Sequence, residues 1–387
     1  VEEEEERQRD RGSAAEGLDI SRDLERIFPR CIKWPLQRLA KRSRKVEELG
    51  SEVLRVFQVF VTQSFFPVPQ AAIVVGSAFE GWSPQEDEAV YCLLVPLKPP
   101  PGHTFHLELD NTRENSERNF WIHVQQECTC TSEQREEEEN MLCFLHHPKK
   151  DLRRNQAPSL LDTLCTKTYL DVHKTAHWFQ RFVRGAFMLL PQTHHYNMKV
   201  LPSNRLCKLL LTTFSGKTLP VEIIFGVQQG DSDVFVVSQT TEATFPPSTV
   251  WSESFAVAEV KLFRHMATQG PRGSYHLKCL HLCTRILVGT AFSTYILKTV
   301  VMHLLTTTAP SAWCRRDFLP RLEDIMRHLH HCLQDKRLDH FFLGNKNMPR
   351  EINLPPGFQT AEPINLFKHL VQDPYAHEKA LCEFREL

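Results

Sequence analysis

The chain has 387 residues, of which 41% are hydrophobic and 24% charged, and this composition is typical of a globular protein with one large domain or two ordinary ones. Its 46 lysines and arginines balance 47 aspartates and glutamates, so the formal net charge of −1 gives no global field that would attract nucleic acid or an anionic membrane. No uninterrupted apolar run reaches the roughly 18 residues that a membrane-spanning helix needs. The twelve cysteines are scattered, which favours reduced thiols over a dense disulfide scaffold.

The chain opens with an acidic segment of low complexity. Residues 1–20 include five consecutive glutamates, and such runs form disordered linkers because they cannot bury a core. Because the first residue is Val1 rather than Met, we expect a longer protein with further sequence upstream. Between Leu36 and Val61, apolar residues recur at steps of three and four while charged residues occupy the opposite face. This pattern predicts a long amphipathic helix.

The stretch 72–97 is the part around which we organise the rest of the predicted fold. A short apolar run ends at Gly76-Ser77, a polar loop with Glu86, Asp87 and Glu88 follows, and a second apolar run completes the stretch. Strand, Gly-Ser turn, loop and strand is the pattern of a nucleotidyltransferase core, in which acids on the second strand hold two metal ions. Those acids must lie one residue apart, because only residues i and i+2 of a strand face the same side. A tight turn without any ligand has the same pattern, so both interpretations stay open.

A group of cysteines and histidines follows in the phrase CTCTSEQREEEENMLCFLHH. A C-x-C pair, a gap of twelve residues and a C-x-x-H pair could supply a zinc site from Cys128, Cys130, Cys143 and His146, with His147 adjacent. The alternative is a hairpin with ordinary thiols. C-x-C is a poorer zinc motif than C-x-x-C, and the acidic insert is typical of a loop, so the sequence favours the second interpretation.

The remaining pattern changes from mixed to helical. Alternating residues predict strands over 104–109, 119–125, 208–214, 219–227 and 233–239, with a helix over 170–190. His173 and His177 have a metal-capable spacing in that helix, but without a third ligand we interpret them as ordinary surface or core residues. From Trp251 onward the character changes, and helices are predicted over 255–266, 275–287, 294–305, 318–334 and 376–387. We therefore predict an α+β protein, with a mixed lobe over residues 21–248 and an all-helical lobe over 249–387.

Several phrases, taken in order, resemble one family. They include GSAFEGW (76–82), LLVPLKPPPG (93–102), MLCFLHH (141–147), WFQRF (178–182), GVQQGDSDVFVVSQ (226–239), WSESFAVAE (251–259), YHLKCL (275–280), YILKTVVMHLL (295–305), LDHFFLGN (338–345) and AEPINLFKHLV (361–371). Together they resemble the inositol 1,4,5-trisphosphate receptor-interacting proteins, in particular their first "like" group. That family belongs to the male-abnormal-21 (Mab-21) superfamily, whose enzymatic relative is cyclic GMP-AMP synthase. The resemblance implies a nucleotidyltransferase-like lobe followed by a helical lobe of the Mab-21 HhH/H2TH-like type.

The resemblance also implies which residues stand at the catalytic positions. The enzymes of the superfamily use a Glu-x-Asp pair on the strand after Gly-Ser and a third acid on a later strand. Aligned through the LLVP phrase, the first two positions fall on Val90 and Cys92, and the third falls on Glu222. One acid cannot hold two magnesium ions, which demand octahedral oxygen ligands. The expected remnant of a nucleotide site, without metal or cofactor, comprises Gly76, Ser77, Glu80, Val90, Cys92 and Glu222.

By this resemblance, we expect a non-catalytic interaction protein, a pseudoenzyme. A single membrane span upstream of this chain would tether it, this domain would face the cytoplasm, and the inositol trisphosphate receptor, whose calcium release the family modulates, would be its partner. The alternative is an active or nucleotide-binding, metal-dependent nucleotidyltransferase that uses Glu86, Glu88 and Glu222. Binding to nucleic acid is not expected, because the net charge is near zero and duplex binding needs a concentrated basic face; the candidates are residues 38–45 and scattered residues of the helical lobe such as Arg315 and Arg316.

Overall fold

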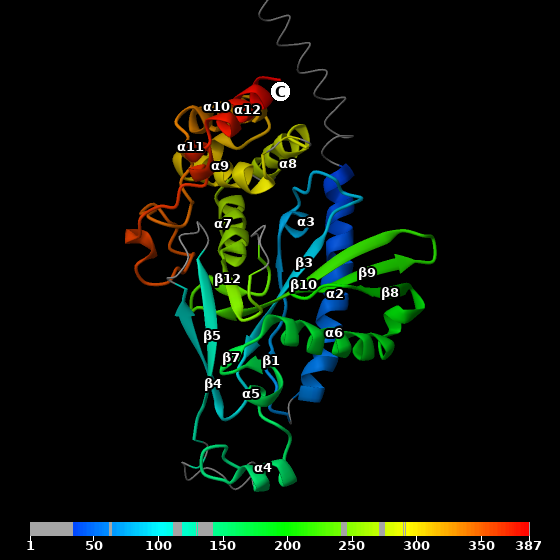
Figure 1. Cartoon of the computed structure of the whole chain (residues 1–387). Helices are drawn as coiled ribbons and strands as arrows, with labels where there is room; N and C mark the ends of the chain where they lie inside the picture. The colour runs from blue at the N-terminus through cyan, green and yellow to red at the C-terminus, as the bar shows by residue number, and fades with distance from the viewer. Residues whose placement is uncertain are drawn as a thin grey trace, which may run out of the picture.

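The structure is a computed structural model that describes residues 34–61, 64–110, 118–128, 130, 142–240, 246–270, 275–288, 290 and 292–386. It has a mixed lobe of strands and helices and a helical lobe that holds the C-terminus (Figure 1). The predicted α+β class is thereby confirmed. The predicted acidic linker, residues 1–20, lies outside the described residues. Among the described helices, none combines the length and the apolar character needed to cross a bilayer.

Helix α2 (Trp34–Val61) runs along one side of the mixed lobe as a single element of 28 residues (Figure 1). Its buried face carries Leu39, Val46, Val53 and Phe57, spaced as one stripe of a helix requires. The Phe57 ring stacks on Phe179 of α6 (Val172–Met188), with the ring centroids 4.8 Å apart. The long amphipathic helix predicted from the apolar periodicity is confirmed. Its apolar stripe faces the core of the mixed lobe and packs against α6.

One curled sheet forms the centre of the mixed lobe. Its strands are β1 (Val68–Pro69), β2 (Ile73–Val75), β3 (Tyr91–Lys98), β4 (His103–Leu109), β5 (Asn119–Gln126), β6 (Cys165–Thr166), β7 (Tyr169–Leu170), β8 (Tyr196–Leu201), β9 (Cys207–Thr213), β10 (Thr218–Gln228), β11 (Phe235–Val237) and β12 (Val250–Ser254). The main path runs β1-β3-β10-β11-β12-β5-β7-β6, with β2 on β3, β4 on β5, and β8 on β9, which pairs with β10. Only β3 and β10, among these pairs, run parallel.

The register of the central strands decides which residues meet. Glu222 of β10 lies opposite Cys92 of β3, and Val75 of β2 lies opposite Cys92 on the other side. The chain leaves β2 through Gly76 directly into α3 (Ser77–Glu80). The β2–α3 turn and the distant strand β10 therefore come together at one end of β3.

Helix α6 and several short helices complete the mixed lobe. The Asp171 carboxylate caps α6 by accepting hydrogen bonds from the backbone N–H groups of His173 and Lys174, at 2.9 and 3.1 Å. This cap explains why the helix begins slightly later than the predicted residue 170. The short helices are α4 (Lys149–Asn155), α5 (Leu160–Thr163) and the 3₁₀ turn η2 (Pro191–His194).

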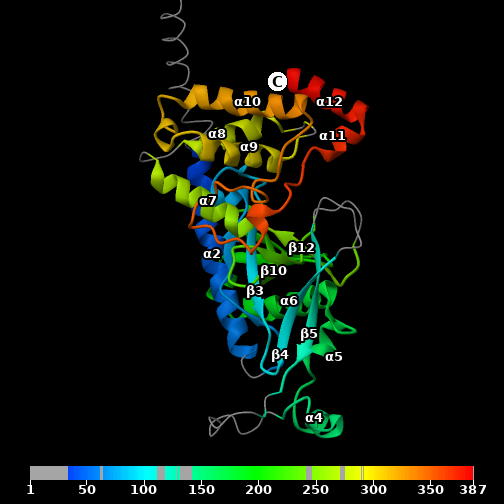
Figure 2. The same cartoon turned by 90° about the vertical axis from the view of Figure 1, so that its left-hand side faces the viewer.

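The helical lobe has a hydrophobic core of its own. It contains α7 (Ala256–Gln269), α8 (His276–Ile286), α9 (Thr294–Thr307), α10 (Phe318–Gln334), α11 (Lys368–Gln372) and α12 (Pro374–Arg385), with 3₁₀ turns η3 (Pro310–Ala312) and η4 (Phe358–Thr360). Figure 2 shows α7 lying between the sheet and the remaining helices, with α10 and α12 farthest from the sheet. The helical character predicted for this region is confirmed for these elements.

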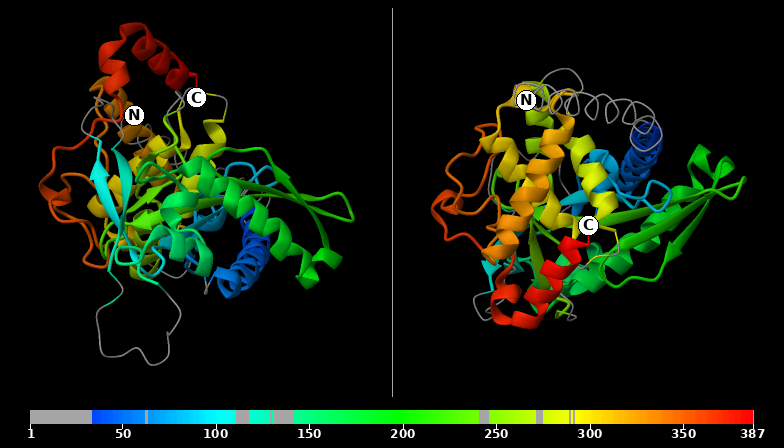
Figure 3. Two further views of the ribbon diagram at one scale, coloured as in Figure 1. Left: turned by 60° about the horizontal axis from the view of Figure 1, so that its bottom comes forward. Right: turned by 90° about the horizontal axis from the view of Figure 1, so that it is seen from above.

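The predicted boundary between the two lobes, at residue 249, lies before the end of the sheet. Strand β12 (Val250–Ser254) pairs antiparallel with β11 and β5, so the sheet continues past the predicted boundary at residue 249. Five residues are too few for a period of two to stand out from a helical pattern. Strand β8 (Tyr196–Leu201) was not predicted either, and with β9 it forms a hairpin that projects from the side of the mixed lobe (Figure 3).

Candidate functional site

A cleft of about 590 Å³ lies between the two lobes. The β2–α3 turn, β3 and β10 line it from the mixed lobe, and α7 and α9 line it from the helical lobe. At the turn, Gly76 has a φ of 85°, a conformation that residues with a side chain rarely adopt. Gly76 and Ser77 both lie on the cleft wall. The structure thus places the predicted Gly-Ser turn on the wall of a cavity.

The three positions that would hold metal-binding acids line this same cleft. Val90 precedes β3, Cys92 lies two residues further on, and Glu222 is the neighbour of Cys92 on β10. Burial raises the pKa of the Cys92 thiol to about 12, and the nearby carboxylates of Glu222 and Glu80 act in the same direction. Cys92 is therefore a neutral thiol at physiological pH, which is a poor ligand for magnesium.

Glu222 already has a cationic partner. The Nζ atom of Lys208, directly across from it on β9, lies 2.9 Å from the Glu222 carboxylate. A divalent ion at this carboxylate would have to compete with that ammonium group. The wall formed by Val90, Cys92 and Glu222 therefore offers one ion-paired carboxylate where two metal ions would need several oxygen ligands.

A buried ion cluster lies beside the cleft. The Nζ atom of Lys298, on α9, is 2.8 Å from Glu80 of α3 and 2.6 Å from Glu259 of α7. The exposed fractions of these side chains are 5%, 3% and 9%. Glu80 also accepts a hydrogen bond of 2.7 Å from the indole nitrogen of Trp82. Glu80, predicted to belong to a remnant nucleotide site, instead connects the two lobes.

Glu86 and Glu88, which the alternative nucleotidyltransferase interpretation requires as metal ligands, have different surroundings. Glu86 forms an ion pair with Arg38 of α2, and its backbone carbonyl accepts a hydrogen bond of 2.6 Å from Arg42. Arg42 also binds the carboxylate of Asp87 at 2.8 Å. The basic residues of α2 thus hold this loop, while Glu88 lines the cleft. The structure does not bring Glu86 and Glu88 together at one metal position.

Three residues that shape the cleft were missed from the sequence: Lys208, Glu259 and Lys298. Lys298 was the most detectable, because it is the single charge in the apolar phrase YILKTVVM. A lone lysine in such a phrase needs a buried anion as its partner. Its partner Glu259 is likewise one acid within FAVAEV. The sequence cannot pair the two, because they are 39 residues apart on different helices.

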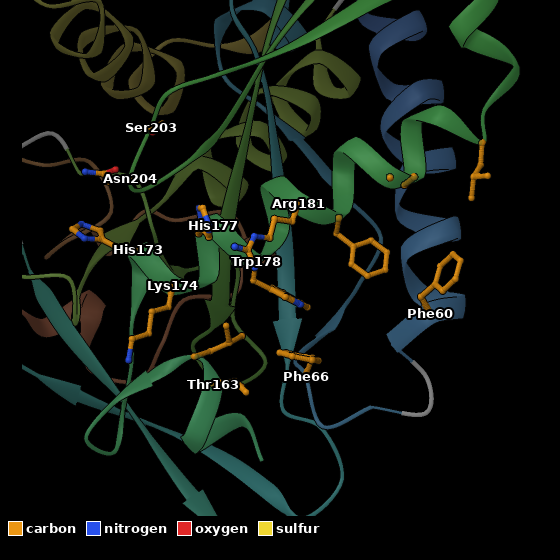
Figure 4. Close-up of a pocket in the computed structure, with 15 residues that line it drawn as sticks. Phe60, Phe66, Thr163, His173, Lys174, His177, Trp178, Arg181, Ser203 and Asn204 are labelled. Carbon is orange, nitrogen blue, oxygen red and sulfur yellow. The ribbon is translucent and has the colours of Figure 1, made fainter. Parts of the chain in front are cut away.

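A second cavity, of about 960 Å³, lies on the outer side of α6. Figure 4 shows Lys174, His177, Trp178 and Arg181 projecting from α6 along it, with Phe60 of α2 at one end. Phe60 is strongly exposed, and so is Leu189, which also lines the cavity. No aspartate or glutamate is among the described residues that line it. We call this cavity the α6 groove. It is apolar with a basic rim.

The predicted zinc candidates also come together, at a distance from the cleft. Cys128 and Cys130 follow β5, and Cys143 and His146 precede α4, which lies at the opposite end of the molecule from the helical lobe (Figure 1). All four ligand atoms lie within 4.8 Å of one another. His173 and His177 line the α6 groove instead and belong to no group of metal-ligating side chains among the described residues.

Comparison with known proteins finds similarity through both lobes. The model of the Mab-21 protein HhH/H2TH-like domain matches residues 275–355. Inositol 1,4,5-trisphosphate receptor-interacting protein-like 1 of Rattus norvegicus is 31% identical over 381 residues, which cover 96% of this chain and 69% of that protein. The protein of the same name from Mus musculus is 32% identical, covering 94% and 68%. Inositol 1,4,5-trisphosphate receptor-interacting protein of Homo sapiens is 28% identical, covering 97% and 72%.

Proposed function

Because this chain belongs to the inositol 1,4,5-trisphosphate receptor-interacting protein family, we propose that it is a non-catalytic interaction protein on a degenerate nucleotidyltransferase scaffold. The family predicted from the sequence is confirmed by this membership. The relatives are named for interaction with the inositol trisphosphate receptor, and the proposal gives this chain the same partner. It also includes a membrane tether upstream of the chain and a cytoplasmic position for this domain, as the family resemblance implies.

The observation that carries the non-catalytic part is the chemistry of the cleft wall. Val90 has no ligand atom, the Cys92 thiol is neutral, and Glu222 is paired with Lys208. Transfer of a nucleotidyl group requires metal ions to neutralise the phosphates and to activate the nucleophile. Nothing in this set of side chains supports two such ions.

The test of this part is nucleotide binding by the purified chain. We expect no rise in melting temperature with ATP or GTP, whether magnesium or manganese is present, and no nucleotide product. A ligand at 100 times its Kd would stabilise the folded state by about 2.7 kcal/mol, which is readily measured. The triple variant V90E/C92D/K208M restores acids and removes the competing cation, so it serves as the positive comparison. A metal-dependent shift in the wild-type chain that Glu222→Gln abolishes would establish the transferase alternative instead.

The surface for the protein partner is, under this proposal, the α6 groove. Its floor and ends are apolar, with Trp178, Phe60 and Leu189, while Lys174 and Arg181 give the rim positive charge. Charge complementarity therefore selects an amphipathic helix of the receptor that carries acidic residues beside its apolar stripe. Exposed aromatic and aliphatic side chains in a concave surface are typical anchors of such complexes.

Two charge substitutions test this surface against a matched control. Leu189→Glu and Arg181→Glu should each weaken binding to the purified inositol trisphosphate receptor at least tenfold. Phe214→Glu is the control, because Phe214 is 83% exposed in the β9–β10 turn, outside the groove. Melting temperatures should be unchanged in all three, since the side chains are exposed. Unchanged affinity in both groove variants would exclude this surface, and absence of binding by the wild-type chain would exclude the receptor as partner.

A further inference from the structure

Four ligand atoms from two separate segments meet beside α4. The Nδ1 atom of His146 lies 3.2 Å from the sulfur of Cys130, 3.3 Å from that of Cys128 and 3.8 Å from that of Cys143. The sulfurs of Cys128 and Cys143 are 4.0 Å apart. The first two cysteines follow the sheet, and the other two ligands come after an interval of twelve residues. Folding therefore gathers residues that the sequence keeps apart.

These separations match the edges of a zinc coordination tetrahedron. With Zn–S bonds of about 2.3 Å and Zn–N bonds of about 2.0–2.1 Å, tetrahedral geometry places ligand atoms about 3.5–3.8 Å from one another. The four separations given above, 3.2–4.0 Å, surround this range. Hydrogen bonding alone does not account for the arrangement, because thiols are weak donors and weak acceptors.

The surrounding contacts hold the second pair of ligands in place. The Gln156 side chain clamps the backbone of Leu142, accepting from its N–H at 3.0 Å and donating to its carbonyl at 3.1 Å. The next residue, Cys143, is buried, and the ring of Phe144 packs edge-on against Phe65, with centroids 4.7 Å apart. His147 points elsewhere, because its Nδ1 atom contacts the Cys143 carbonyl at 3.2 Å. The fold thus selects His146, and not its neighbour, as the fourth ligand.

We propose that Cys128, Cys130, Cys143 and His146 form a structural zinc site that fastens the end of β5 to the segment entering α4. Three thiolates and one imidazole are a soft ligand set that selects zinc over magnesium or calcium. Four protein ligands complete the coordination sphere and leave no open position for a substrate or water, which is the hallmark of a structural rather than a catalytic site. This site is independent of the proposed receptor interaction and of the cleft.

Metal analysis of the intact chain tests the site. The wild-type chain should be produced with zinc in the medium and purified without a metal-affinity step. It should then carry one zinc per molecule, as measured by inductively coupled plasma mass spectrometry. Cys128→Ser and His146→Ala should lose most of it. Cys382→Ser should keep the full complement, because Cys382 is an exposed cysteine on α12, remote from the cluster. A strong chelator should lower the melting temperature of the wild-type chain and leave that of Cys128→Ser unchanged.

A conservative variant separates loss of a ligand from loss of folding. His146→Cys retains four ligands, so it should still bind one zinc, and its cobalt form should show stronger sulfur-to-cobalt charge-transfer absorption than the wild-type cobalt form. Three results would overturn the proposal: a wild-type chain without zinc, equal zinc in all variants, or a disulfide between Cys128 and Cys143 found by alkylation of the freshly purified chain.

Discussion

Lys298 lies between two carboxylates where water cannot screen their charge. Removing it leaves Glu80 and Glu259 buried without a cation, and an uncompensated buried charge costs about 3–5 kcal/mol. We therefore expect Lys298→Met to lower the free energy of unfolding by about that amount in urea denaturation. Lys379→Met is the matched control. Its side chain is 61% exposed and its Nζ atom lies 3.8 Å from the Glu383 carboxylate, so the change should be below about 1 kcal/mol.

The same variant should have a distinctive pH dependence. Burial raises the pKa of Glu259, and Lys298 normally opposes this effect. A carboxyl group whose pKa is higher in the folded than in the unfolded state destabilises the fold when it is ionised, that is, at pH values above the folded pKa. The stability lost in Lys298→Met should therefore partly return as the pH falls below neutral through the raised pKa of Glu259. A deficit that is independent of pH would mean that lost packing, rather than charge, dominates.

Two buried histidines predict acid sensitivity of the helical lobe. Burial lowers the pKa values of His276 and His340 to about 4. An unfolded histidine titrates near about 6.5, so the unfolded state binds these protons first and stability falls as the pH drops from about 6.5 to 4. Each group contributes up to about 3 kcal/mol to this loss. His276→Phe, which preserves the stack on Phe263, should reduce the slope of stability against pH, and substitution of the exposed His369 by Gln should not.

At the scale of elements, two glycines offer a matched comparison in the irregular segment before α11. Gly344 and Gly357 have φ angles of 71° and 86°. A Cβ atom on Gly344 would lie 2.8 Å from the Ala361 carbonyl oxygen and 2.6 Å from the Pro363 ring, whereas Gly357 has open space. Gly357→Ala should cost only the backbone penalty of about 1–2 kcal/mol. Gly344→Ala should cost clearly more, as measured by the denaturation midpoint, and equal costs would mean that the segment shifts to make room.

The elements that the sequence predicted best are those in which one face is buried over several turns. Helix α2 repeats its apolar stripe through Leu39, Val46 and Phe57, and this repetition fixes both its type and its buried face. Strand β12 has five residues, and its inward Trp251 is recognisable only through its partners β5 and β11. Short elements take their structure from tertiary pairing, which local periodicity does not contain.

In the candidate cleft, too, some residues could be predicted from the sequence, while others depend on tertiary pairing. The Gly-Ser turn and the acid Glu222 could be identified from the resemblance to the superfamily's enzymes, and the parallel pairing of β3 with β10 brings Glu222 next to Cys92. The ion-pair partners of the acids in and beside the cleft could not be predicted from the sequence. Lys208 neutralises Glu222 through strand register, and Lys298 reaches Glu80 across 218 residues. The zinc ligands were visible as residue types, but their convergence depends on the packing of Leu142 and Phe144, which spacing alone does not reveal.

At the scale of the whole molecule, the two lobes are joined by buried contacts. Trp82 follows α3 in the mixed lobe, yet its ring is buried in the core of the helical lobe. Asp233, beyond β10, is held to the other lobe by an ion pair of 2.5 Å with Lys261 and a backbone hydrogen bond of 2.7 Å to Asn353. Because of these contacts, unfolding of one lobe would expose buried apolar surface of the other. The two lobes should therefore unfold together.

We therefore expect one calorimetric transition for the wild-type chain, with the calorimetric enthalpy equal to the van't Hoff enthalpy. Trp82→Ala should lower stability by about 3–5 kcal/mol and separate the lobes into two transitions, because it removes a shared side chain. Trp251→Ala is the control, since Trp251 is equally buried but lies within the mixed-lobe core. It should lower the melting temperature while the transition stays single. Two transitions in the wild-type chain would show that the interface between the lobes is weaker than its buried contacts imply.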